Sequence, residues 1–116
     1  MSRKISIASS RANDSTNYAL YTVPTKNTAL WNMMYIISTA GNTSPEVFWY
    51  DSSTNSTYIV VAGKNLVSGD YILFNQAEVA LQEGDIIYVK NPSATNVTFI
   101  ATVELVPNQA MQFHGA

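Results

Sequence analysis

The chain has 116 residues, no cysteine and a formal net charge of −2. This length suits one domain, and the lack of cysteine excludes a disulfide framework, thiolate chemistry and cysteine-ligated zinc. Charged residues make up only 12% of the chain, against about 25% in an ordinary soluble domain. The mildly acidic balance argues against a nucleic-acid-binding protein, which needs a basic surface.

The sequence predicts neither a signal peptide nor a membrane span. Arg3 and Lys4 are basic, but no apolar segment follows them as it would in a signal peptide. No stretch approaches the roughly 18 apolar residues of a membrane helix. We therefore expect a soluble chain that is made in the cytoplasm of its host and has no membrane partner.

The N-terminal part predicts short strands separated by polar turns. Ile5 and Ile7 alternate with polar neighbours and indicate a first strand, and residues 9–17 read as a polar loop. A second strand is expected over residues 18–23. It ends at Pro24, which cannot donate a hydrogen bond to a central ladder.

Residues 29–39 form the most apolar segment. A helix is the competing interpretation, but the β-branched and aromatic residues favour a strand that is apolar on both faces. One face would consist of Leu30, Met34 and Ile36, and the other of Trp31, Met33, Tyr35 and Ile37. Such a strand is either covered twice or carries a subunit contact. The second face is therefore our candidate oligomer interface.

The remaining sequence predicts a hairpin, three short strands and one long strand. The hairpin joins residues 46–51 to 57–62, the short strands cover 71–74, 78–81 and 86–90, and the long strand covers 97–106. Gly69 and Gly84 each precede an aspartate in turns where glycine supplies a positive φ. About eight or nine strands predict an all-β, antiparallel β-sandwich of jelly-roll type. We expect one domain over residues 1–106 and a tail or arm over 107–116.

Nothing in the sequence predicts a catalytic, metal or cofactor site. The single histidine, His114, lies in the expected tail, where it would need partners from across the fold. Glu83 and Asp85 flank a glycine and could form a hydrolytic pair, but acidic residues are also common in turns. Calcium in these turns is conceivable, although no segment matches a twelve-residue calcium loop.

Four aromatic residues suggest a binding surface. Flat rings with a polar tip suit sugars, although the same residues are favoured in core packing and cross-strand pairs. The candidate glycan surface consists of Trp49, Tyr50, Tyr58 and Tyr71.

The order of several motifs resembles that of small virion proteins of tailed phages. The resemblance rests on residues 20–24, 41–42, 50–53, 66–70 and 79–85, and on the final strand at 97–106. It implies a β-sandwich found in head decoration, neck, tail or fibre components, usually as a multimer. It supplies no catalytic residues.

Sequence and resemblance together suggest a non-enzymatic virion component, most simply a capsid decoration (cement) subunit. Its expected partners are copies of itself, with a trimer preferred, and other virion proteins such as the major capsid protein. The alternative is a neck, tail or fibre component, with or without a receptor- or glycan-binding role.

Overall fold

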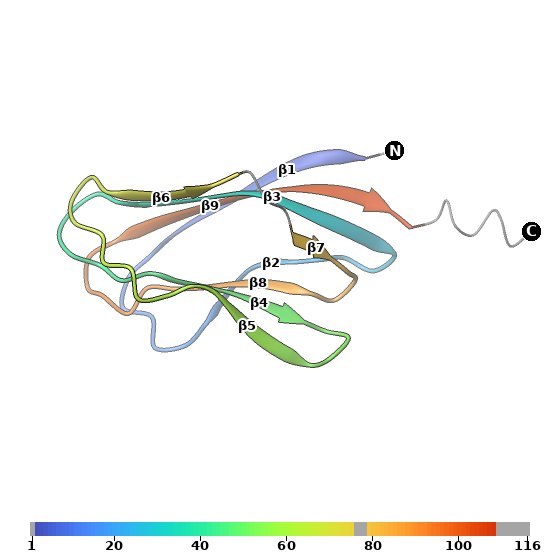
Figure 1. Cartoon of the computed structure of the whole chain (residues 1–116), viewed down its shortest axis with the longest axis horizontal. Coiled ribbons are helices and arrows are strands. Elements are labelled where there is room, and N and C mark those ends of the chain that lie inside the picture. Colours follow the sequence, from blue (N-terminus) through green and yellow to red (C-terminus); the bar gives the residue numbers. More distant parts are fainter. Residues whose placement is uncertain (1, 76–78, 109–116) are drawn as a thin grey trace, which may run out of the picture.

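The computed structural model describes residues 2–75 and 79–108, which form two packed antiparallel sheets (Figure 1). Sheet A has the order β1 (Arg3–Arg11), β9 (Val97–Pro107), β3 (Asn27–Ser38) and β6 (Tyr71–Phe74), and β7 (Val79–Leu81) also pairs with β3. Sheet B has the order β2 (Tyr18–Thr22), β8 (Ile86–Lys90), β4 (Glu46–Asp51) and β5 (Ser56–Val61). The predicted all-β, antiparallel sandwich is confirmed.

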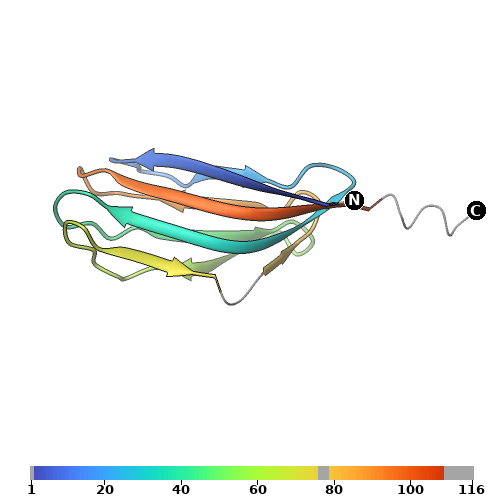
Figure 2. The ribbon, with the colours of Figure 1, turned by 90° about the horizontal axis from the view of Figure 1, so that it is seen from above.

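Most connections cross from one sheet to the other, as in a jelly roll. Among the named strands, only the β4–β5 and β6–β7 connections stay within one sheet. The β4–β5 hairpin is the one predicted from the sequence, and Trp49 pairs with Tyr58 at its centre. Seen from above, the strands of sheet A run side by side along the long axis of the molecule (Figure 2).

Strand β9 lies between β1 and β3 and supplies much of the core. Its residues alternate strictly between buried and partly exposed positions, as half-buried antiparallel strands require. The inward side chains are Val97, Phe99, Ala101, Val103 and Leu105. They face the buried residues of sheet B, among them Ile87 and Val89.

A β-bulge in β3 changes the alternation expected for residues 29–39. The register with β9 shifts between Trp31 and Met33, so one extra residue enters β3 at this point. Trp31 therefore points inward together with Met34 and Ile36, and its side chain is only 1% exposed. The predicted placement of Trp31 on the outer face with Met33 is wrong, because strict period two does not allow for the bulge.

Strand β1 is longer than predicted and reaches Arg11, well into the expected polar loop. It pairs with β9 over nine residues, from Arg3 opposite Leu105 to Arg11 opposite Val97. Beyond the strand, Asp14 binds the Arg11 guanidinium at 2.7 Å and accepts the Asn91 N–H at 3.1 Å. These contacts hold the β1–β2 connection against the β8–β9 turn.

The turn predictions agree with the backbone. Gly69 and Gly84 both have φ of +85°, the region that glycine adopts without strain.

Residues 109–116, including His114, lie outside the described part of the chain, so the domain boundary near 106 stays a prediction. No helix that could cross a membrane occurs within residues 2–75 and 79–108.

The bulge predicts opposite effects for two adjacent substitutions. Met34→Asp should prevent folding, because Met34 is fully buried and an unpaired buried carboxylate costs several kcal/mol. Met33→Asp should leave the chain folded, since Met33 is only partly buried and faces outward. Circular dichroism and urea unfolding measure both effects. Unfolding by both variants would contradict the assigned register.

Candidate functional site

The outer face of sheet A carries a continuous patch of apolar and aromatic side chains. Cross-strand pairing places Met33 opposite Thr102, Tyr35 between Leu73 and Ile100, and Ile37 between Tyr71 and Thr98. We call this patch the apolar outer face; it consists of Met33, Tyr35, Ile37, Tyr71, Leu73 and Ile100. None of these side chains is charged, so the face can contact another protein without desolvating an ion.

Two of these side chains are well exposed to solvent. Tyr71 is 58% exposed and Leu73 is 46% exposed, both on the edge strand β6. The rings of Tyr35 and Tyr71 contact each other with centroids 5.6 Å apart. A connected apolar patch of this kind is typical of an interaction surface.

The other half of the same sheet face is covered by hydroxyl groups. Ser6 and Thr102 share a hydrogen bond of 3.0 Å, and Ser10 and Thr98 share one of 2.9 Å. The hydroxyls lie on β1 and β9, beside the apolar side chains of β3 and β6. Lys4 and Glu104, paired across β1 and β9, lie on the same side of the sheet as these hydroxyls. The face therefore changes from polar on β1 and β9 to apolar on β3 and β6.

The structure divides the predicted oligomer interface. Met33, Tyr35 and Ile37 lie on the apolar outer face, whereas Trp31 packs in the core and contacts Phe74 edge-on, with centroids 6.0 Å apart. The use of the first three as an interface stays a prediction. Ile100 was missed, although the alternation of the last strand already placed it opposite the buried residues.

The predicted glycan residues do not share one surface. Trp49 lies partly buried on the inner side of sheet B and contacts the Tyr58 ring, with centroids 5.4 Å apart. Tyr50 lies on the outer side, in contact with Tyr88. Tyr71 belongs to sheet A. The structure therefore brings only Trp49 and Tyr58 into contact.

Asp85 is a buried carboxylate that joins the β4–β5 hairpin to the β7–β8 turn. Its Oδ1 accepts the N–H and the hydroxyl of Ser52 at 2.9 and 2.8 Å. Its Oδ2 accepts the Gln82 N–H at 3.0 Å and the Trp49 indole N–H at 3.2 Å. Its side chain therefore cross-links these two segments of the chain.

The same hydrogen bonds determine the charge of Asp85. Burial raises the pKa of this carboxyl, but the donors from Gln82, Ser52 and Trp49 outweigh burial and hold the pKa below its ordinary value. A general acid of a hydrolase would instead need a raised pKa. Glu83, the other member of the hypothetical pair, accepts the backbone N–H of Lys26 at 2.7 Å. This geometry favours the structural interpretation of both residues.

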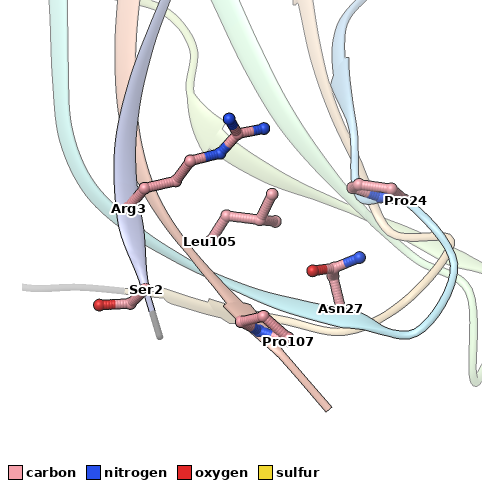
Figure 3. A pocket seen from close by; sticks show the side chains of 6 residues that line it. All are labelled: Ser2, Arg3, Pro24, Asn27, Leu105 and Pro107. Carbon is pink, nitrogen blue, oxygen red and sulfur yellow. The ribbon is translucent and has the colours of Figure 1, made fainter. Parts of the chain in front are cut away.

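A cavity of about 400 Å³ opens at the end of the sandwich where β1 begins (Figure 3). Arg3 and Leu105 extend into this space from β1 and β9, toward the segment that carries Pro24. The lining residues are Ser2, Arg3, Pro24, Asn27, Leu105 and Pro107. Arg3 supplies the one charged group among these lining residues. Residues 2–75 and 79–108 contain no cluster of three or more metal-ligating side chains.

Comparison with known proteins supports the fold. No protein-family model matches the chain, and no curated protein sequence matches it. A structure of Bacillus endospore appendages, a family of disulfide-linked pili, is similar with a TM-score of 0.53 and 12% identity. That similarity covers 92% of this chain and 87% of the pilus chain.

Viral capsid structures show a weaker similarity. The infectious bursal disease virus Gt strain has a TM-score of 0.46 and 10% identity, over 93% of this chain and 34% of the viral chain. The Gx strain has a TM-score of 0.42 and 13% identity, over 98% and 44%. This chain therefore spans less than half of those viral chains. At such identities, similarity shows the fold alone, and only the pilus comparison is strong enough to do so.

Asp85→Asn tests the structural role of the buried carboxylate. The amide is isosteric, but its NH₂ group would face donors, so we expect a loss of about 2 kcal/mol in unfolding free energy at pH 7. Because the folded pKa is lowered, wild-type stability should fall as the pH drops from about 4 through the folded pKa of Asp85. The variant should lose less stability over that range.

Asp70→Asn is the matched control for this measurement. Asp70 accepts the Val67 N–H at 3.2 Å in an equivalent turn, but it is exposed, so its loss should cost well under 1 kcal/mol. Urea unfolding at several pH values measures both variants. Equal costs for Asp85→Asn and Asp70→Asn would refute the anchoring role of Asp85.

Proposed function

We propose that this chain is a non-enzymatic structural subunit that associates with copies of itself through the apolar outer face of sheet A and forms part of a virion. The observation that carries the proposal is the uncharged face formed by Met33, Tyr35, Ile37, Tyr71, Leu73 and Ile100. Within a virion, we favour the role of a decoration subunit on the head of a tailed phage, which is one of the roles that the sequence resemblance implies. Its partners would then be copies of the chain and the major capsid protein.

The magnitude of the apolar burial supports an oligomer. Fully burying a large apolar side chain contributes about 1.5–3 kcal/mol, and Tyr71 and Leu73 still expose roughly half of theirs. Association itself costs several kcal/mol in lost freedom. An oligomer therefore needs the whole face, including the hydroxyl rows on β1 and β9. A trimer, as preferred from the sequence, would bring several copies of this face together.

The fold also suits a subunit of an extended assembly. The pilus similarity concerns a protein that builds appendages on the spore surface, and its fold resembles that of this chain over most of its length. Those pili are disulfide-linked, whereas this chain has no cysteine. An assembly of this chain therefore cannot be held by disulfides, which increases the importance of the apolar outer face.

The alternative role is a neck, tail or fibre component with a receptor- or glycan-binding surface. Tyr58 is 47% exposed and stacks on Trp49, which leaves one aromatic pair accessible at the edge of sheet B. Localisation on the particle and glycan binding separate this alternative from a decoration role.

Met33→Asp should dissociate the oligomer without unfolding the subunit. A carboxylate buried at the interface without a partner costs several kcal/mol, which lowers the association constant by more than about 100-fold. Size-exclusion chromatography with light scattering should show an oligomer for the wild type and a monomer for Met33→Asp. Thr22→Asp, at an exposed position of sheet B, is the control and should remain oligomeric. An unchanged mass for Met33→Asp would contradict the proposed interface.

Antibody-gold labelling of purified particles tests the virion assignment. Gold distributed over the head is the result expected for a decoration subunit. Gold confined to the neck, tail or fibres would reject decoration and favour the alternative, which glycan-array binding by wild type and Trp49→Ala would then test. Particles without gold, despite the chain being detected in infected cells, would overturn the virion role.

A further inference from the structure

Strand β5 is an edge strand whose two sides both expose apolar side chains. It lies at the end of sheet B and pairs only with β4 (Figure 1). Tyr58 is 47% exposed on the inner side of the sheet, next to Trp49, and Ile59 is 69% exposed on the outer side, next to Phe48. The strand, Ser56–Val61, contains no charged residue and no proline. An edge of this kind is a template for pairing with another strand.

The other described edges carry features that discourage pairing. Strand β1 has Arg3, Lys4 and Arg11, and β2 has a bulge between Ala19 and Tyr21. The opposite edge of sheet A is divided into two short strands, β6 and β7, with four and three residues. Charges, bulges and short strands are the devices by which proteins protect sheet edges.

The protection of β5 is incomplete. Its register with β4 shifts between Val47 and Phe48, which leaves Val60 as the extra residue of a bulge. The preceding residues, from Ser56 to Ile59, pair regularly with residues 48–51 of β4. This regular stretch keeps one free backbone edge.

We propose that β5 pairs antiparallel with β5 of a second copy of the chain, so that sheet B continues from one subunit into the next. The added strand would extend the Trp49–Tyr58 row on the inner side and the Phe48–Ile59 row on the outer side. A second β5 fits because the strand has no charges, so self-pairing opposes no like charges. The contact lies on a different sheet from the apolar outer face and is independent of the proposed function.

Symmetry restricts the register of such a pair. A two-fold axis perpendicular to sheet B keeps the outer sides of both copies on the same side. Paired residues must then lie on the same side of the sheet. Only a register in which one residue of β5 lies opposite the same residue of the second copy meets this condition. Side chains directly opposite each other in an antiparallel pair have Cβ atoms about 4.5–5.5 Å apart. At a non-hydrogen-bonded pair this separation is close to that of a disulfide.

Single-cysteine variants test the proposal, since the natural chain has no cysteine to interfere. The three β5 variants are Thr57→Cys, Tyr58→Cys and Ile59→Cys in the full chain. Thr22→Cys, at an exposed position of the edge strand β2 and away from the apolar outer face, is the matched control. Each variant is oxidised with copper–phenanthroline at one concentration, and the disulfide-linked dimer is measured by non-reducing electrophoresis and mass spectrometry. Circular dichroism confirms that each variant is folded.

The expected result is at least about tenfold more rapid dimer formation at one β5 position than at Thr22→Cys. That advantage should be lost when a neighbouring exposed residue of β5 is also changed to lysine, as in Thr57→Lys or Ile59→Lys. Dimer formation at β5 no faster than at Thr22→Cys would overturn the proposal. A disulfide between Ile59→Cys and Gln112→Cys in the double variant, in place of the symmetric one, would overturn it in favour of the C-terminal segment as the added strand.

The same experiment distinguishes this contact from the proposed function. Met33→Asp should leave the β5 disulfide unaffected, because it changes only the outer face of sheet A. If Met33→Asp remains oligomeric while β5 cross-links, the proposed outer-face interface fails and the edge contact stands. If Met33→Asp dissociates the oligomer while β5 does not cross-link, the edge contact fails and the outer face stands.

Discussion

The β-bulge in β3 is the constraint on which the arrangement of sheet A depends. Strand β3 is the central strand of that sheet and pairs with β9 along its whole length. On its other side, β6 ends opposite Met34 and β7 begins opposite Trp31, so the bulge coincides with the change of partner. The extra residue lets Trp31 and Met34 both point into the core. Without the bulge, either Trp31 or both Met34 and Ile36 would face outward.

The sequence predicted well those elements whose pattern is strictly local. Strand β9 alternates without interruption, and the turns at Gly69 and Gly84 carry residues that require a positive φ. The sequence predicted less well the features that depend on pairing with a strand distant in the chain. Ser9 to Arg11 look like a loop because they are polar, yet they pair with β9. The bulge leaves no local signature, so Trp31 was placed on the wrong face. Tyr71 and Leu73 join Tyr35 only through cross-strand register, which no local pattern reveals.

The low content of charged residues is consistent with the two apolar surfaces, the outer face of sheet A and the β5 edge. Water-facing polarity is supplied largely by hydroxyl and amide groups, as in the Ser6–Thr102 and Ser10–Thr98 pairs. The few ions with defined roles serve the fold: Asp14 binds Arg11, and Asp85 accepts four hydrogen bonds from the β4–β5 hairpin and the β7–β8 turn. A face built from hydroxyls and rings can be covered by another subunit at small desolvation cost. Such a composition suits a protein whose surface is in contact with neighbouring subunits.

The pairing of β1 with β9 has a consequence for the order in which the chain acquires structure. Arg3 lies opposite Leu105, so a contact made by the third residue must wait until the hundredth and later residues have been synthesised. Long-range pairing of this kind slows folding and leaves partly formed sheets exposed meanwhile. While the ribosome is still adding β9, strand β3 still lacks its main partner and its apolar sides are exposed. The nascent domain is therefore most vulnerable to aggregation just before its last strand emerges, and it benefits most from a chaperone at that moment.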